Sequence, residues 1–212
     1  MVRLMCGSLA LKLLVGVRRL WVSVVWGSLI LLCCRSLRIR GLRNLPETPV
    51  IIAANHASHA DTVLLQFVLA TRHRRPVLVA GAEDYWFRSA LMKLGAVGLG
   101  VFAFPRNGKV GVFRARKAIR KEASVVLFPQ GSRAGGRFRQ GVGHIAEDGS
   151  TDVVPVYIDG SSRILARGQR WPRRAHVAIV FGAPMRREAS ESAGAFADRL
   201  GEVVLSELAS TA

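Results

Sequence analysis

The stretch VIIAANHASHADTVLLQFVLATR, residues 50–72, decides the fold class. Its first five residues form an apolar run that is typical of a buried strand. Residues 62–72 have the apolar spacing of a helix, and the polar residues 55–61 lie between the two. A strand that passes through a short turn into a helix is the repeating unit of an α/β sheet.

The same alternation continues toward the C-terminus. Further strands are predicted at 76–82, 101–104, 124–129, 152–159 and 175–182. Further helices are predicted at 85–96, 111–123 and from about residue 190 onward. Because strands that alternate with helices align in parallel, we predict a mixed, mostly parallel sheet flanked by helices, in one domain over residues 38–212.

Residues 1–37 are predicted to form a membrane-associated helical segment. Residues 20–34, LWVSVVWGSLILLCC, contain no charged side chain, but they fall short of the roughly 20 residues that cross a bilayer. Two helices lying on the membrane are favoured, with Trp21 and Trp26 at its interface. A buried core helix is the alternative, and whether residues 9–34 span the membrane or lie on it stays open.

The chain is strongly basic, with 31 Lys and Arg against 14 Asp and Glu and a formal net charge of +17. Such a charge favours anionic partners, among them an acidic membrane surface, an acidic carrier protein or a phosphorylated substrate. Nucleic acid is not expected as a partner, because no helix-turn-helix, zinc or RNA-binding signature is present.

The three cysteines, Cys6, Cys33 and Cys34, form neither a disulfide framework nor a zinc-ligand spacing. No metal is therefore expected, and a reducing compartment is the simpler interpretation. Together with the apolar N-terminal segment, this places the expected location at the cytoplasmic face of a membrane.

The polar turn allows two interpretations. Ser58 followed by Asp61 has the spacing of a capping box, which explains both residues structurally. His56 would then lie at the carboxyl end of a strand, where α/β sheets bind ligands, and Asp61 could reach its imidazole. Such a pair leaves one ring nitrogen free as a base. From this turn alone, a catalytic pair and a helix cap with a solvent-facing histidine are equally favoured.

Two other site types fit the turn less well. A metal bound by His56, His59 and Asp61 would need an unusual ligand spacing. A nucleophilic Ser58 lacks the G-x-S-x-G turn that exposes such a serine.

A candidate anion site follows two other strands. In FPQGSR, residues 128–133, Gly131 permits close backbone approach and Arg133 offers a planar fork for phosphate oxygens. Arg106 also follows a strand. Each arginine alone fits a surface role, but beside His56 and Asp61 they describe a base next to an anion site.

These segments, over residues 38–185, resemble the glycerophospholipid acyltransferases typified by 1-acylglycerol-3-phosphate acyltransferase. The turn carries every defined position of the motif N-H-x-S-x-x-D, which includes the family's H-x4-D pair: Asn55, His56, Ser58 and Asp61. GAVGLGVFAFPR, ending at Arg106, resembles the second motif. FPQGSR resembles the third with Pro129, Gln130, Gly131, Ser132 and Arg133, and VVPVYI resembles the fourth with Pro155.

The resemblance implies a membrane enzyme of phospholipid biosynthesis. His56, held by Asp61, would act as general base on the hydroxyl of lysophosphatidic acid or a related lysophospholipid. That hydroxyl would attack the thioester of acyl-CoA or acyl-carrier protein, with no covalent acyl-enzyme and no cofactor. The resemblance further implies that Arg106, Gly131 and Arg133 bind the acceptor's phosphate.

The third motif departs from the family pattern. Gln130 replaces the usual glutamate, and Ser132 replaces threonine. A second hypothesis is therefore a non-catalytic binder of anionic lipid or acyl-carrier protein on the same fold. The acyl-chain length, the donor, the acceptor headgroup and the oligomeric state stay open.

Overall fold

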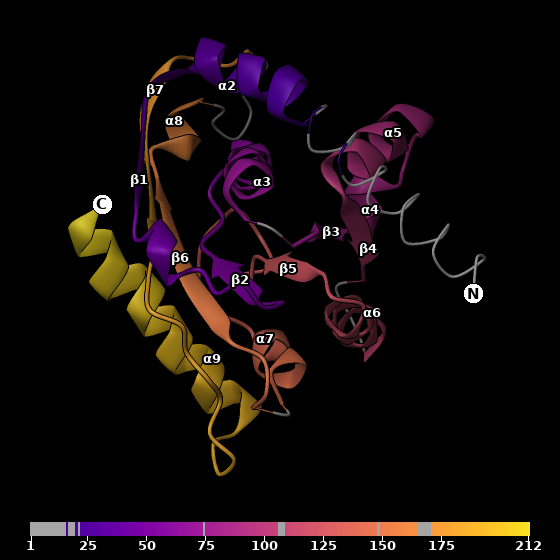
Figure 1. Cartoon of the computed structure of the whole chain (residues 1–212), viewed down its shortest axis with the longest axis vertical. Coiled ribbons are helices and arrows are strands. Elements are labelled where there is room, and N and C mark those ends of the chain that lie inside the picture. The colour runs from indigo at the N-terminus through magenta and orange to yellow at the C-terminus, as the bar shows by residue number, and fades with distance from the viewer. Residues whose placement is uncertain are drawn as a thin grey trace.

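The computed structural model describes residues 16, 20, 22–73, 75–105, 109–147, 149–164 and 171–212. Within them, seven strands form one sheet in the order β1-β7-β6-β2-β5-β3-β4 (Figure 1). The strands are β1 Cys34–Arg40, β2 Ile51–Ala54, β3 Val77–Ala82, β4 Val101–Phe104, β5 Ser124–Leu127, β6 Val153–Asp159 and β7 Ala175–Phe181. Only the β6–β7 pair among these neighbours is antiparallel, which confirms a mixed, mostly parallel sheet.

Helices cover both faces of this sheet (Figure 1). One face carries η1 Val22–Trp26, α2 Gly27–Cys33, α3 Ala60–Arg72, α5 Ala90–Leu99 and α8 Ser161–Ile164. The other carries α6 Lys109–Arg120, α7 Gly141–Ile145, α9 Ala193–Glu202 and η3 Val203–Leu208. Shorter elements are η2 Leu42–Asn44, α4 Glu83–Trp86 and η4 Ala209–Thr211.

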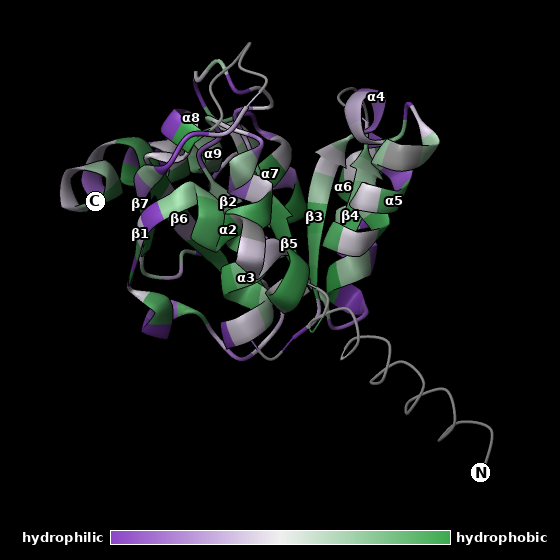
Figure 2. Cartoon of the chain, turned by 90° about the horizontal axis from the view of Figure 1, so that it is seen from above, coloured by the Kyte–Doolittle hydropathy of each residue, from purple (hydrophilic) through white to green (hydrophobic). Residues whose placement is uncertain are grey.

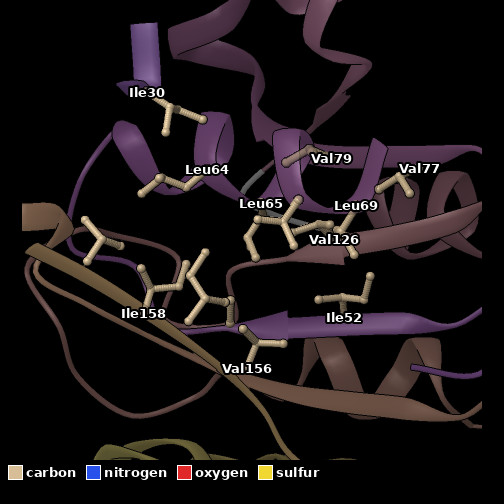
Figure 3. Close-up of a cluster of buried hydrophobic side chains, with 14 of the residues drawn as sticks. Ile30, Ile52, Leu64, Leu65, Leu69, Val77, Val79, Val126, Val156 and Ile158 are labelled. Carbon is tan, nitrogen blue, oxygen red and sulfur yellow. The ribbon is translucent and has the colours of Figure 1, made fainter. Parts of the chain in front are cut away.

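The central strand β2 supplies side chains to two cores. Its four residues are all buried, and the strand looks green in Figure 2 because they are apolar. Since successive strand residues point to opposite faces, Ile52 packs toward α3 and Ile51 toward α7 and α9. Figure 3 shows Ile52 on β2 and Leu65 on α3 within the first of these cores. Each fully buried aliphatic side chain contributes about 1.5–3 kcal/mol.

The helix predicted at 85–96 is two helices, α4 and α5, separated by a short turn. Ser89 caps α5 by accepting a hydrogen bond from the backbone N–H of Met92 over 3.3 Å. The glycine-rich stretch 95–100 continues this helix and ends it at Gly100, whose φ of 65° suits the left-handed C-cap position. The backbone reversal of this stretch is therefore confined to Gly100.

The described part of the N-terminal apolar tract packs on the sheet domain. Ile30 and Cys33 of α2 are buried in the core, and Gly27 lies close to the ring of Phe67. Trp26 packs partly buried against the same core, whereas Trp21 lies outside the described residues. The expected division between residues 37 and 38 falls inside β1, which pairs with β7.

Within the described residues, no helix is long and apolar enough to cross a membrane. The expected membrane-associated segment is not confirmed, and most of residues 1–21 lie outside the described ranges.

Candidate active site

The polar turn begins with Asn55, which joins the end of β2 to the neighbouring strand β6. Asn55 is buried at the end of β2, and its Nδ2 donates to the carbonyl of Ile158 over 3.0 Å. Its Oδ1 accepts from the N–H of Ile158 over 2.7 Å. This paired contact with β6 gives Asn55 a structural role and sets the position of the next residue, His56.

His56 and Asp61 form the pair that the turn predicts. Nδ1 of His56 lies 2.8 Å from Oδ2 of Asp61, whose side chain is fully buried. The same oxygen accepts the backbone N–H groups of Ala57 and Ser58, each over 2.8 Å. Three donors on one oxygen fix the carboxylate. A carboxylate at Nδ1 selects the tautomer with hydrogen on that nitrogen, which leaves Nε2 as an acceptor.

A variant of the capping box is also present. Oγ of Ser58 accepts the N–H of Ala60, two residues on, over 3.2 Å, and the Asp61 carboxylate accepts the N–H of Ser58 in return. His59, which directly precedes α3, already has helical dihedral angles and makes no side-chain cap contact, so the cap contacts come from Ser58, one residue earlier. The cap therefore bends the chain so that Asp61 reaches back to His56.

Gln130 connects this turn to the loop after β5. Its Oε1 accepts the backbone N–H of His56 over 2.7 Å, and its Nε2 donates to the carbonyl of Gly136 over 3.1 Å. The orientation of the amide is fixed, because a backbone N–H can only meet the oxygen end. A carboxylate could accept from His56 but could not donate to Gly136. Only an amide at this position can make both contacts at once.

Gly131 has a φ of 70°, and its N–H donates to the carbonyl of Phe128 over 2.9 Å. A Cβ at this position would lie 2.9 Å from Nε of Arg139. The close approach predicted for Gly131 is therefore occupied by an arginine side chain. Arg139 is a cleft residue that the sequence interpretation did not select.

A cleft of about 1290 Å³ opens beside His56, whose side chain is 16% exposed and stacks on the Phe128 ring at 4.2 Å. Arg133, Arg139 and Lys109 line this cleft together with His56. Apolar side chains line the part between α6 and α7, namely Phe104, Val112, Leu127, Val142 and Ile145. The cleft therefore combines a histidine, several cations and an apolar wall.

His59, which occupies an undefined position of the motif N-H-x-S-x-x-D, also lines the cleft. Its ring stacks on Tyr85 of α4 at 4.4 Å, and the Arg88 guanidinium lies 5.7 Å from the Tyr85 ring centre. Burial, followed by the positive charge of Arg133, lowers the pKa of His59 from 6.5 to about 4. Its imidazole is therefore neutral at physiological pH.

The remaining predicted site residues lie in the loop after β5, inside strand β6, or outside the described residues. Ser132 and Pro129 lie in the loop after β5, and Ser132 lines the cleft next to Arg133. Pro155 is buried within β6, pairs with Ala53 and accepts the N–H of Gly182 at its carbonyl, so its surroundings are structural. Arg106 lies outside the described residues.

Comparisons with known proteins point to one family. Residues 36–159 match the family model described as Acyltransferase. Chloroplastic 1-acyl-sn-glycerol-3-phosphate acyltransferases of Brassica napus and Arabidopsis thaliana are 26% and 27% identical over 165 and 161 residues. These matches cover 70% of this chain but only 44% and 43% of the two relatives, so the chain spans under half of their length.

A solved structure shows the same fold. The 1-acyl-sn-glycerophosphate (LPA) acyltransferase of Thermotoga maritima superposes with a TM-score of 0.71 at 17% identity. The match covers 94% of this chain and 80% of that chain.

Proposed function

The chain belongs to the acyltransferase family, and on that premise we propose that it acylates a lysophospholipid. The reaction transfers a fatty acyl group from an acyl thioester to the hydroxyl of lysophosphatidic acid or a related acceptor. The acyl donor is acyl-CoA or acyl-carrier protein.

The contact between His56 and Asp61 carries this proposal. Nε2 of His56 takes the proton of the acceptor hydroxyl as its oxygen attacks the thioester carbonyl. Asp61 stabilises the resulting imidazolium through the 2.8 Å contact. When the carbon–sulfur bond breaks, the imidazolium returns the proton to the leaving thiolate. General base catalysis of this kind contributes about 10²–10⁴ in rate.

The cations of the cleft supply the acceptor's phosphate site. Arg133 and Arg139 line the cleft beside His56, and an arginine guanidinium can bind two phosphate oxygens at once. Arg106 is proposed as a third phosphate ligand on the resemblance of its motif. Gly131 contributes by leaving room for the Arg139 side chain.

We further propose that the enzyme works at the cytoplasmic face of a membrane. Leu31 and Leu32 of α2 are exposed although α2 is otherwise anchored in the core. The exposed leucines favour contact with a leaflet, and the net charge of +17 favours an anionic one, where each nearby cation contributes about 1 kcal/mol.

A non-catalytic binder of anionic lipid or acyl-carrier protein is the second candidate. It is motivated by Gln130, which replaces the usual glutamate of the third motif. The two contacts of Gln130 give its amide a positioning role that is compatible with catalysis. The complete His56–Asp61 pair at a cleft favours the enzyme.

The two candidates are separated by incubation with a labelled acyl thioester and a panel of lysophospholipids. We expect a labelled diacyl product with at least lysophosphatidic acid. Binding of lipid or donor without any ester product, for every acceptor in the panel, would favour the non-catalytic binder.

A further inference from the structure

We propose that the outward face of α6 is a docking surface for an acidic acyl-carrier protein that delivers the acyl thioester. The inference rests on the proposed function. Helix α6 reads KVGVFRARKAIR and contains five basic and no acidic residues. Gly111 and Ala115 are buried, and a Cβ at Gly111 would lie 2.8 Å from the Phe104 ring. The helix therefore packs on the sheet through this side and presents the opposite side outward.

The cations of this outward face have no acidic partners among the described residues. Lys109, Lys117 and Arg120 form no ion pair within the described residues, and all three are exposed. By contrast, Arg116 pairs with Glu147. Glu122, which follows the helix, pairs with Arg75 over 2.6 Å. The positive charge of the outward face is thus uncompensated and attracts an acidic surface.

Two large apolar side chains lie among these cations. Phe113 is 63% exposed and Val110 is 50% exposed, and they are neighbours on the helix surface at a spacing of three residues. An apolar centre surrounded by charged groups is the usual anatomy of a protein–protein interface. Twelve residues of helix extend for about 18 Å, a length suited to a helix of a small protein.

The docking surface and the cleft share a helix. Lys109, Val112 and Phe113 of α6 line the cleft that also contains His56. A protein bound on α6 would therefore stand at the edge of the cleft, where a thioester on a flexible arm could enter toward His56. Because the docking surface adjoins the cleft, a protein that carries the acyl group fits this arrangement better than a protein that carries no substrate.

The position of α6 argues against the membrane as its partner. The exposed leucines of α2 lie with α3 and α5 on one face of the sheet (Figure 1). Helix α6 lies with α7 and α9 on the other face. The two helices thus lie on opposite faces of the sheet, which favours a soluble partner for α6 over a leaflet that contacts α2.

The test compares two donors on the full chain. Lys117→Glu/Arg120→Glu reverses two charges that do not line the cleft, and Arg173→Glu/Arg174→Glu is the control with the same charge change beside β7. Lysophosphatidic acid is presented in neutral detergent micelles. We expect the KM for acyl-carrier protein to rise about tenfold in the α6 variant only, with the KM for acyl-CoA within about twofold of wild type. Acyl-CoA turnover also reports that the variant is folded.

Several results would overturn the inference. They are an unchanged KM for the carrier protein, an equal rise with acyl-CoA, an equal rise in the control variant, or wild-type transfer from acyl-CoA alone. If the α6 variant instead loses binding to phosphatidylglycerol vesicles while its carrier KM stays unchanged, the surface belongs to the leaflet. Absence of wild-type transfer from either donor would refute the proposed function itself.

Discussion

The backbone N–H of His56 donates to Oε1 of Gln130, and Nε2 of the same amide donates to the carbonyl of Gly136. Gln130→Glu keeps the first contact and loses the second, and it places a carboxylate in a buried position. We expect the free energy of unfolding at pH 7 to fall by about 1–3 kcal/mol. Because a protonated glutamate can donate to Gly136, the loss should shrink as the pH falls toward 4. Urea unfolding at several pH values measures both effects.

Gln140→Glu is the matched control, because Gln140 is exposed and its side chain makes no cap contact at α7. Its stability should stay close to wild type at every pH. If Gln130→Glu were equally neutral, the bridging role of Gln130 would be refuted.

Asp61→Asn tests how the histidine is held. The amide is similar in size but carries no charge, so it stabilises the imidazolium less and does not select the Nδ1–H tautomer. We expect kcat to fall by about 10²–10⁴ while the KM for lysophosphatidic acid changes little. Steady-state kinetics on protein of verified fold give both values. A preserved kcat with a raised KM would instead assign Asp61 to acceptor binding.

Gly131→Ala tests the contact between Gly131 and Arg139. Alanine must adopt a φ of 70°, which costs about 1–2 kcal/mol, and its Cβ displaces the Arg139 side chain. Gly135→Ala carries the same backbone cost at a φ of 79°, but a Cβ there meets no atom within 4 Å. Both variants should lose similar stability, and only Gly131→Ala should raise the KM for lysophosphatidic acid. If the KM for lysophosphatidic acid were equal in the two variants, Arg139 would be excluded from the acceptor site.

His59 makes folding sensitive to acid. Its pKa is near 4 in the folded chain, against 6.5 for the free side chain, so the unfolded chain binds more protons between these values. Stability is therefore fully present above about pH 6.5 and falls as the pH drops toward 4. Relative to His59→Gln, which cannot protonate, wild type should lose free energy of unfolding over this window. A difference between the two proteins that is independent of pH would contradict the burial of a neutral His59.

Parts of the fold and the site could be predicted because they depend on local sequence. Strand β2 is buried on both faces, so it appears as an uninterrupted apolar run, and the cap at Ser58 follows from spacing alone. Strand β1 could not be predicted. Its three arginines follow an apolar tract and resemble a membrane flank, but in the fold they mark the exposed edge of a sheet.

Tertiary packing determines the rest of the site. Tyr85 and Arg139 reach the cleft from α4 and from the loop before α7, and no local pattern indicates this. The role of the Gln130 amide likewise depends on the tertiary fold, which places Gly136 and the His56 backbone on either side of it.

The most direct test of the central claim is acyl transfer by His56→Gln. Glutamine retains polar atoms at this position but cannot accept a proton as imidazole does. We predict that transfer from a labelled acyl thioester to lysophosphatidic acid falls at least about 100-fold, with the thermal unfolding transition retained. Near-normal transfer by this folded variant would contradict the assignment of His56 as the general base.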